Sequence, residues 1–520
     1  MGATRRPSIG EATVDVAFIG DHQPPDTTNF TTEFRLFLEL AIPTCLLSFG
    51  FTLSPLLTAS YVGLKFGPTY LSAFTLGNLT GNLSTFSLLA GIFSASDTLS
   101  PQAFGVGDYQ EVGFLAMRGV VACLALVTPI NILLVLYLEP VLVAVGQDPV
   151  AAFHAASWYR IFVWALPFFV VYDATWKFLS AQHVMKPLIC VSIFSCVVIL
   201  PLALEFFTER HGFLGSAMAY ATFQASQCIL LLLYLAILKP HTEGTWPGLS
   251  QWRDALKLKP MMEYLRLGTG GILSQSEWIY WEALGLMVGN VGVVSLSAHT
   301  IPNQVIMIAC QFPFSFGTAL AIRMGHVLSK SAEHAQNLVL GTSFFSMLFF
   351  AILSAVIYYS ADSLIDVFTT DMEVSTLAES VWWKVVAFNL NISVFGLLCG
   401  TATGLGMQWT LGAINFFFLW IFGIPVTFYF ALVRGGGLAS VWTWINVPYT
   451  CMNIGLIIIF IMADWQDVHK KINEREEKCA ALDVETQLGH DKQSDTLSLE
   501  TQELLTADVK MNSYGGFASG

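Results

Sequence analysis

The feature that most constrains this chain is a series of long apolar runs that recurs from residue 37 to residue 463. Each run holds about 20 or more mainly apolar residues, enough for a helix to cross roughly 30 Å of hydrocarbon at about 1.5 Å per residue. Because lipid offers backbone groups no partners, such runs predict transmembrane helices. The predicted spans are 37–60, 68–93, 112–137, 157–180, 187–206, 213–237, 264–289, 293–318, 338–360, 380–403, 410–432 and 437–463.

Composition supports this interpretation. The 520 residues are 54% hydrophobic and only 12% charged, whereas about a quarter of the residues of a soluble domain are charged. The sequence therefore predicts an all-α integral membrane protein with twelve transmembrane helices.

A polar, basic linker divides the predicted spans six and six. Features also recur across it: Gln102–Gly107 follows the second span, and Ile322–His326 follows the eighth. An even number of spans per half gives both halves one orientation, so we expect two six-helix lobes related by a parallel internal repeat. The predicted segments are a flexible cytoplasmic N-terminal arm at 1–33, an N-lobe at 34–238, a cytoplasmic linker loop at 239–263, a C-lobe at 264–463 and an acidic disordered cytoplasmic tail at 464–520.

Loop charge predicts the orientation of these spans. Cytoplasmic loops carry an excess of Lys and Arg, so the basic linker and the basic residues after the last span indicate that both termini are cytoplasmic. The basic residues are Lys239, Arg253, Lys257, Lys259 and Arg266 in and beside the linker, and Lys470, Lys471 and Arg475 at the start of the tail. The loop between spans nine and ten is acidic and is expected on the opposite side.

Several functional classes find no support in the sequence. No G-x-x-x-x-G-K-[ST] cradle for ATP and no H-E-x-x-H or G-x-S-x-G signature occurs, so we expect neither a nucleotide-driven pump nor an enzyme. The nine cysteines form no C-x-x-C pair, and we expect no disulfide framework, metal or cofactor. The net charge of −13 lies partly in the tail and gives no sign of a nucleic-acid partner. The functional class that remains is a transporter driven by an ion gradient.

Two carboxylates in the seventh predicted span are the main chemical candidates. A lipid-facing Glu costs several kcal/mol, so Glu277 and Glu282 are interpreted as a proton or ion site facing a cavity; the alternative is that one is a structural acid. They lie five residues apart, about 140° around a straight helix. Either the helix bends near Gly268, Gly270 and Gly271, or the two acids flank a broad polar sector.

Neighbouring aromatic and polar residues complete the candidate binding set. Trp278, Tyr280 and Trp281 can stack on a cationic substrate or simply pack. His299 can relay protons or serve as a hydrogen-bonded packing residue, and Asn303 is a further polar candidate. Elsewhere, the i,i+4 spacing of Asp173 and Lys177 predicts an ion pair.

Four segments, read in order, resemble the multidrug and toxic compound extrusion (MATE) family, specifically its eukaryotic type. They are DTLSPQAFGVGDYQEVG (97–113), SEWIYWE (276–282), AIRMGHVLS (321–329) and GTATGLGMQWTLGAINFF (400–417). The resemblance implies a V-shaped pair of lobes, a central cavity, and antiport of an organic compound against protons or sodium. It marks as gating or structural motif residues Asp97, Gln102, Gly105, Gly107, Arg323, Gly325, Gly400, Gly404, Gly406 and Gln408.

The chain also departs from the family's pattern. The first span has Pro43 but no acid, as in the proton-coupled eukaryotic branch, while the tenth span lacks the acid that relatives often carry and offers Asn389 and Asn391 instead. Thr403 stands where the family usually has Arg. Charge in the second half is therefore expected to rest on the seventh span.

These observations predict a secondary active efflux transporter that exchanges a small, cationic organic compound for protons by alternating access. A lipid or glycolipid flippase of a related two-lobe fold is the main alternative, and a membrane-embedded receptor or enzyme is less favoured. The expected partners are the substrate, the proton and the bilayer, with the protein a monomer. The expected location is the plasma membrane or, from the dileucine-like Glu500–Leu505, a vacuolar or endosomal membrane.

Overall fold

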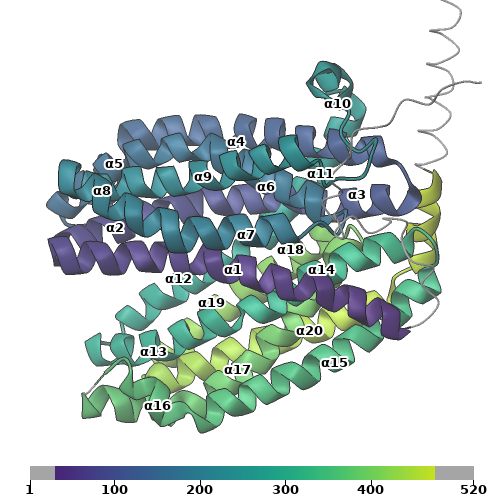
Figure 1. Ribbon diagram of the computed structural model, residues 1–520. Coiled ribbons are helices and arrows are strands. Elements are labelled where there is room, and N and C mark those ends of the chain that lie inside the picture. Colours follow the sequence, from purple (N-terminus) through teal and green to yellow (C-terminus); the bar gives the residue numbers. More distant parts are fainter. Residues whose placement is uncertain (1–29, 370, 475–520) are drawn as a thin grey trace, which may run out of the picture.

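The structure is a computed structural model that describes residues 30–369 and 371–474, apart from the side chains of Pro68, Leu249, Glu282, Leu286 and Val293. Over these residues the chain forms helices and connecting turns, and no strand (Figure 1). The first half contains α1 (Phe30–Phe66), α2 (Pro68–Gly81), η1 (Asn82–Phe86), α3 (Ser87–Val106), α4 (Tyr109–Ala144), α5 (Pro149–Phe162), η2 (Val163–Ala165), α6 (Leu166–Ser180), α7 (Lys186–Phe194), η3 (Ser195–Ile199), α8 (Leu200–His211) and α9 (Leu214–Leu238).

The remaining elements belong to the linker and the second half. They are η4 (Leu249–Gln251), α10 (Trp252–Ala255), α11 (Leu258–Ser274), α12 (Ser276–Gly289), α13 (Val293–Ala309), α14 (Gln311–Leu328), α15 (Ala332–Tyr359), α16 (Ala361–Asp366), α17 (Met372–Gly404), α18 (Gln408–Asn415), η5 (Phe416–Gly423), α19 (Ile424–Phe428), η6 (Tyr429–Val433) and α20 (Gly437–Met462).

Each of the twelve predicted spans falls on helix. Ten helical stretches within the described residues are long and apolar enough to cross a membrane. The other two predicted spans fall on α2–η1–α3 and on α11 with α12. The latter pair is interrupted at Gln275, so its parts are only 17 and 14 residues long. The all-helical membrane fold predicted from hydropathy is confirmed.

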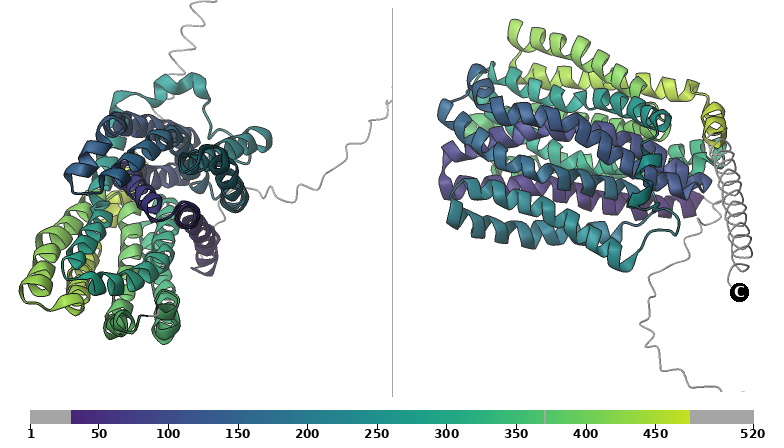
Figure 2. Two further views of the ribbon diagram at one scale, coloured as in Figure 1. Left: turned by 90° about the vertical axis from the view of Figure 1, so that its left-hand side faces the viewer. Right: turned by 90° about the horizontal axis from the view of Figure 1, so that it is seen from above.

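The helices form two groups (Figures 1 and 2). Figure 1 shows α2 and α4 to α9 in one group and α13 to α20 in the other, with α1 running between them. Each group has its own aromatic core: Trp158 and Phe162 are buried in the first, and Phe388 and Trp442 in the second. α11 lies at the junction, where it packs against α3 and α18.

Short polar side chains begin several of these helices. The Asp148 carboxylate accepts hydrogen bonds from the backbone N–H groups of Val150 and Ala151 at the start of α5, at 3.0 and 2.9 Å. Asp371 caps α17 in the same way. Because the first N–H groups of a helix have no internal partner, such caps fix where each helix starts.

The helices extend beyond some predicted boundaries. α1 begins at Phe30, inside the predicted arm, and α11 begins at Leu258, inside the predicted linker. Residues 465–474 are helical, although the prediction placed them in a disordered tail. Trp465 and Ile472 are buried there, and burial of this apolar face stabilises the helix. The remaining residues of the predicted arm and tail lie outside the described ranges.

Candidate functional site

Glu277 lies in the first turn of α12, directly after the interruption at Gln275. The residue is only 5% exposed. The hydroxyl of Tyr449, from α20, donates a 2.5 Å hydrogen bond to Glu277 Oε1. Trp281 Nε1, one turn further along α12, donates to the same hydroxyl at 3.1 Å. Glu277, Tyr449 and Trp281 therefore form a short buried chain of hydrogen bonds between α12 and α20.

No basic side chain balances this acid among the described residues. None of the ion pairs that the described part of the chain forms includes Glu277. Its titratable neighbours are Cys310, Cys399, Tyr280 and Tyr449, groups that are uncharged at neutral pH in their ordinary state. An acid in such surroundings is able to bind a proton or a cation.

The Tyr449 ring is held by two phenylalanines of α17. The rings of Phe388 and Phe395 meet it edge-on, with centroids 4.9 and 5.6 Å from its own. Edge-to-face contacts of this kind have a preferred geometry. They fix the plane of the ring and with it the position of the hydroxyl.

The other predicted aromatic residues have different surroundings. Tyr280 is fully buried and lies near Trp420, with ring centroids 6.5 Å apart, which matches the packing alternative. Trp278 is half-buried beside Phe314, at 5.9 Å. Glu282 lies on α12, but its side chain is outside the described part of the structure.

His299 and Asn303 lie on α13. The His299 ring is 3% exposed and packs against Trp442 of α20 at 5.4 Å. His299 Nδ1 and Asn303 Oδ1 are buried without a hydrogen-bond partner among the described residues. Within the described contacts, neither side chain is hydrogen-bonded to Glu277, so the proton relay through His299 stays a prediction.

The seventh span is interrupted after the three glycines near which one of the two alternatives placed a bend. The helix is interrupted at Gln275, whereas Gly268, Gly270 and Gly271 lie within α11. A Cβ at Gly268 would lie 3.0 Å from the Ile92 backbone, and one at Gly270 would lie 2.8 Å from the Trp409 ring. These glycines therefore serve close helix packing rather than bending.

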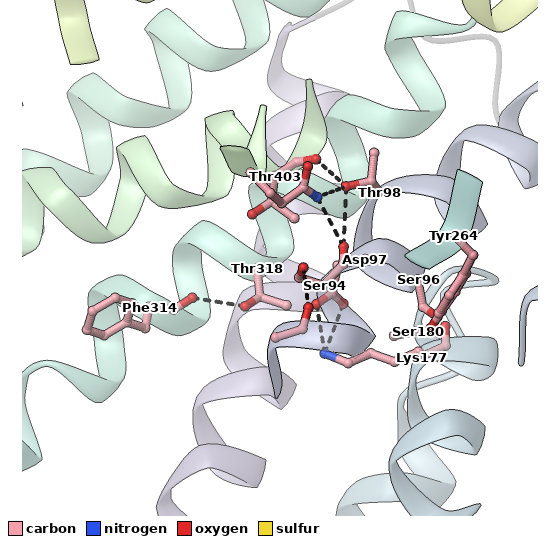
Figure 3. A network of polar contacts seen from close by, with 12 residues as sticks. Ser94, Ser96, Asp97, Thr98, Lys177, Ser180, Tyr264, Phe314, Thr318 and Thr403 are labelled. Atoms are coloured by element: carbon pink, nitrogen blue, oxygen red, sulfur yellow. Dashed lines mark hydrogen bonds and ion pairs between the residues drawn. The ribbon is translucent and has the colours of Figure 1, made fainter. Parts of the chain in front are cut away.

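Asp97 lies on α3 in an ion pair with Lys177 of α6 (Figure 3). Lys177 Nζ is 2.9 Å from Asp97 Oδ1 and 3.0 Å from Oδ2, and both side chains are largely buried. The direct ion pair of Lys177 is thus with Asp97 on α3 and not with the predicted partner Asp173, which interacts with the lysine electrostatically without forming one of the described ion pairs. The i,i+4 spacing carries no information about an acid 80 residues earlier in the chain.

Polar contacts also join α3 to the end of α17 and the start of α18. Thr98 Oγ1 donates to the Thr403 carbonyl at 2.5 Å (Figure 3), and Gln102 Nε2 donates to the Gly404 carbonyl at 3.0 Å. Gln408 Nε2 donates to Thr98 Oγ1 at 2.6 Å. Gly406 supplies the left-handed backbone of the turn between α17 and α18, with φ of 73°. The structure thus brings together motif residues that lie about 300 positions apart.

The two recurring segments, Gln102–Gly107 and Ile322–His326, pack against each other where α3 and α14 end. A Cβ at Gly105 would lie 2.7 Å from Ser329 Oγ, and one at Gly325 would lie 2.7 Å from Pro101 Cβ. Gly107 ends α3 in the left-handed conformation, with φ of 93°. Gly400 and Gly404 allow a similar approach between α17 and α14, against Gly317 and Met324 respectively.

Arg323 forms a buried charge cluster at the same end of the molecule. Its Nη2 lies 2.6 Å from Oε2 of Glu33 on α1, and its Nη1 lies 3.0 Å from His183 Nε2. His183 also meets Nδ1 of His326 at 3.0 Å. The sequence prediction included Arg323 but missed Glu33, His183 and Tyr449; for Glu33, the signal was an acid at the edge of the first apolar run.

Comparison with known proteins gives consistent matches over the helical region. The MatE family profile matches residues 43–204 and 272–429. An uncharacterized transporter of Schizosaccharomyces pombe is 29% identical over 421 residues, covering 79% of this chain and 76% of that protein. Multidrug and toxin extrusion protein 1 of Homo sapiens is 26% identical over 448 residues, covering 84% and 76%.

Two solved structures share the fold. The crystal structure of the eukaryotic MATE transporter AtDTX14 superposes with a TM-score of 0.77 at 21% identity, covering 86% of this chain and 99% of that one. The bent form of the Vibrio cholerae MATE transporter VcmN gives 0.71 at 17% identity, covering 86% and 99%.

Proposed function

The chain belongs to the MatE family of transporters, and from this premise we propose that it is a secondary active efflux transporter that exchanges a small organic cation for protons. Glu277 is the central residue of this proposal. A single site that binds either a proton or a cation, but not both at once, couples the two fluxes by competition.

The observation that carries the proposal is the isolation of the Glu277 carboxylate. It is buried on a predicted span, it accepts a hydrogen bond from Tyr449, and no described side chain forms an ion pair with it. Keeping a charge in such a place without a partner costs several kcal/mol. A proton or a bound cation removes that cost, which makes the acid an exchange site.

The transport cycle follows from this competition. Protonation of Glu277 from the acidic outer or lumenal side neutralises the site and expels the cation, and opening to the cytoplasm releases the proton. Glu282, Trp278 and Trp281 assist binding in this scheme. Two halves that rock about the central linker provide the alternating access.

Further parts of the proposal concern the protein's surroundings. The transporter acts as a monomer in the plasma membrane or in a vacuolar or endosomal membrane, with both termini cytoplasmic. The basic linker supports this orientation. No acid occurs from Trp382 to the end of α17 at Gly404, so the proposal assigns the intramembrane acid of the second half to α12.

The test is transport by purified protein in lipid vesicles. With an imposed pH gradient, the fluorescent organic cation ethidium should accumulate, and a protonophore should abolish accumulation while removal of sodium should leave it unchanged. Glu277→Gln should abolish gradient-driven accumulation, because an amide of nearly the same size exchanges no proton. Glu379→Gln, the same substitution at an exposed position of α17, is the matched control and should transport normally.

Two outcomes would contradict the proposal. Accumulation that survives the protonophore and stops without sodium would replace the coupling ion. A folded Glu277→Gln protein that accumulates ethidium with an unchanged pH dependence would show that this carboxylate is structural.

A further inference from the structure

We infer that Tyr449 is a positioning residue: its hydroxyl orients the Glu277 carboxylate and stabilises its charged form throughout the transport cycle. This inference rests on the proposed exchange of proton and cation at Glu277. It adds a residue on a different helix, α20, that acts on the exchange site through one hydrogen bond.

The direction of the hydrogen bonds follows from the chemistry of the three groups. An indole N–H is a donor only, so Trp281 must donate to the Tyr449 oxygen. The phenol has one proton, and an ionised carboxylate has none to give. The Tyr449 hydroxyl must therefore donate to Glu277, at the observed 2.5 Å. Hydrogen bonds to a charged acceptor are shorter and stronger than neutral ones.

Contacts between α17 and α20 hold Tyr449 in place. Asn446 lies about one turn before it and donates to the carbonyl of Lys384 at 3.1 Å. Asn453 lies about one turn after it and donates to the carbonyl of Asn391 at 2.9 Å. The Asn391 amide also donates to Asn446 Oδ1 at 2.8 Å. Helix α20 is thus fastened on both sides of Tyr449, so the hydroxyl has little freedom to leave Glu277.

The bond survives both states of the acid. It engages Oε1 of Glu277 and leaves Oε2 to take the proton or the cation. When Oε2 is protonated, Oε1 remains a carbonyl oxygen and still accepts from Tyr449. The hydroxyl therefore keeps the carboxyl group in one orientation while its charge changes, and it favours the charged state because donation to a carboxylate is stronger than donation to a neutral acid.

The other groups around Glu277 do not supply this effect. Cys310 at the junction of α13 and α14, Cys399 on α17 and Tyr280 on α12 are the remaining titratable neighbours that the structure describes. Each is an uncharged weak acid at neutral pH in its ordinary state. Among the described side chains, Tyr449 makes the 2.5 Å hydrogen bond to the carboxylate, and Trp281, which donates to Tyr449, also interacts with Glu277.

The experiment is infrared difference spectroscopy of the purified full-length protein in lipid between high and low pH. A band from the protonated carboxyl C=O that disappears in Glu277→Gln belongs to Glu277. In Tyr449→Phe this band should move to higher wavenumber, because the C=O loses its donor. The pH of half-protonation should rise by about one unit, the effect of one hydrogen bond to a charged group. The pH for half-maximal ethidium transport should move in the same direction.

Tyr159→Phe is the matched control. Tyr159 is fully buried and donates a bond of similar length, 2.6 Å, to Asn131 Oδ1. Its acceptor is an amide that does not titrate, so this variant should lower thermal stability without moving the band or the pH midpoint. Trp281→Phe leaves the Tyr449 hydroxyl in place but removes the donor behind it. It should move the band slightly in the same direction, and it replaces Tyr449→Phe if that protein does not fold.

The outcomes separate this inference from the proposed function. If Glu277→Gln abolishes coupled transport while Tyr449→Phe and Trp281→Phe both leave the Glu277 band and midpoint unchanged, Tyr449 is only a packing residue and the exchange site stands. If Glu277→Gln still performs coupled transport, the proposed function fails and the role of Tyr449 fails with it. A shift in Tyr159→Phe as large as that in Tyr449→Phe would also overturn the inference.

Discussion

Arg323 and Glu33 are an example of how a single pair of charges is kept inside this helical bundle. Their side chains are 5% and 1% exposed, and the guanidinium donates to Glu33 Oε2 from both Nε and Nη2. Two charges taken out of water gain stability only from each other and from the hydrogen bonds around them. Removing one partner leaves the other charged, buried and unpaired.

We therefore predict that Arg323→Met destabilises the protein by about 3–5 kcal/mol, the cost of leaving one member of a buried pair alone. The measurement is unfolding of the purified protein in detergent. The double variant Glu33→Gln/Arg323→Met should lose less than the sum of the two single variants, because it leaves no uncompensated charge.

Arg35→Met is the control for this prediction. Arg35 pairs with Glu39 on the same helix, but the two side chains are 80% and 53% exposed. Exposed pairs contribute about 0–1 kcal/mol, so this variant should change stability little. Equal losses from Arg35→Met and Arg323→Met would contradict the argument from burial.

The sequence predicted single residues only where the local pattern carried the information. Glu277 could be found because an acid inside an apolar run seldom has a purely structural role. Tyr449 could not, because it lies 172 positions away and an aromatic residue in an apolar run is ordinary. The ion pair of Lys177 with Asp97 was missed for the same reason: the nearer acid, Asp173, satisfied the helical spacing, while the contact to Asp97 depends on how two helices are placed.

At the scale of elements, the closest helix contacts are made at glycines. α3 and α14 meet through Gly105 and Gly325, where a side chain on either helix would overlap the other. Membrane helices associate without a strong hydrophobic driving force, so close backbone approach and van der Waals packing hold them together. The repeated glycine in the two motifs thus has a packing reason.

Gly325→Ala should weaken this crossing. The added methyl group would lie 2.7 Å from Pro101 Cβ, and overpacking of this kind costs about 1–3 kcal/mol. Thermal unfolding in detergent, with ethidium transport at matched protein amounts, measures the effect.

Gly285→Ala provides the comparison for this prediction. Gly285 lies within α12, and no packing partner among the described residues lies within 4 Å of the position its Cβ would take. Alanine there should be neutral or stabilise the helix by up to about 1 kcal/mol. If both alanine variants behaved alike, the contact with Pro101 would not be tight.

Element positions were largely predictable, while interruptions and helix ends were not. Apolar length placed twelve helical segments because a bilayer permits few other structures. The interruption at Gln275 and the helix at residues 465–474 depend on packing: Trp465 and Ile472 are buried, and His469 Nδ1 donates to the carbonyl of Leu328 at 2.7 Å. A polar helix of this kind carries no hydropathy signal.

At the scale of the whole molecule, polar and glycine contacts along α3 join the two halves, together with the packing of α1 on α14 and the Arg323–Glu33 ion pair. Thr98 and Gln102 donate to carbonyl groups at the end of α17, and Gly105 contacts the end of α14. The recurrence of the motif 220 residues apart predicted a repeat. That the two copies pack against each other follows from the arrangement of the halves, which the sequence does not encode locally.

The charges of the loops also predict how the molecule is oriented in its membrane. Ser250 in the basic linker and Ser363 on α16, in the acidic segment between the ninth and tenth predicted spans, are both exposed. In a protein whose nine cysteines are replaced, Ser250→Cys should be labelled by a membrane-impermeant thiol reagent only after cells are opened, while Ser363→Cys should be labelled in intact cells, provided the protein is in the plasma membrane. Changing Lys257, Lys259 and Arg266 to Glu should lower correct insertion more than transport by the inserted fraction, because Lys and Arg near span ends set topology. Labelling of both cysteines from the same side would contradict an odd number of crossings between residues 250 and 363 and with it the division into two six-helix halves.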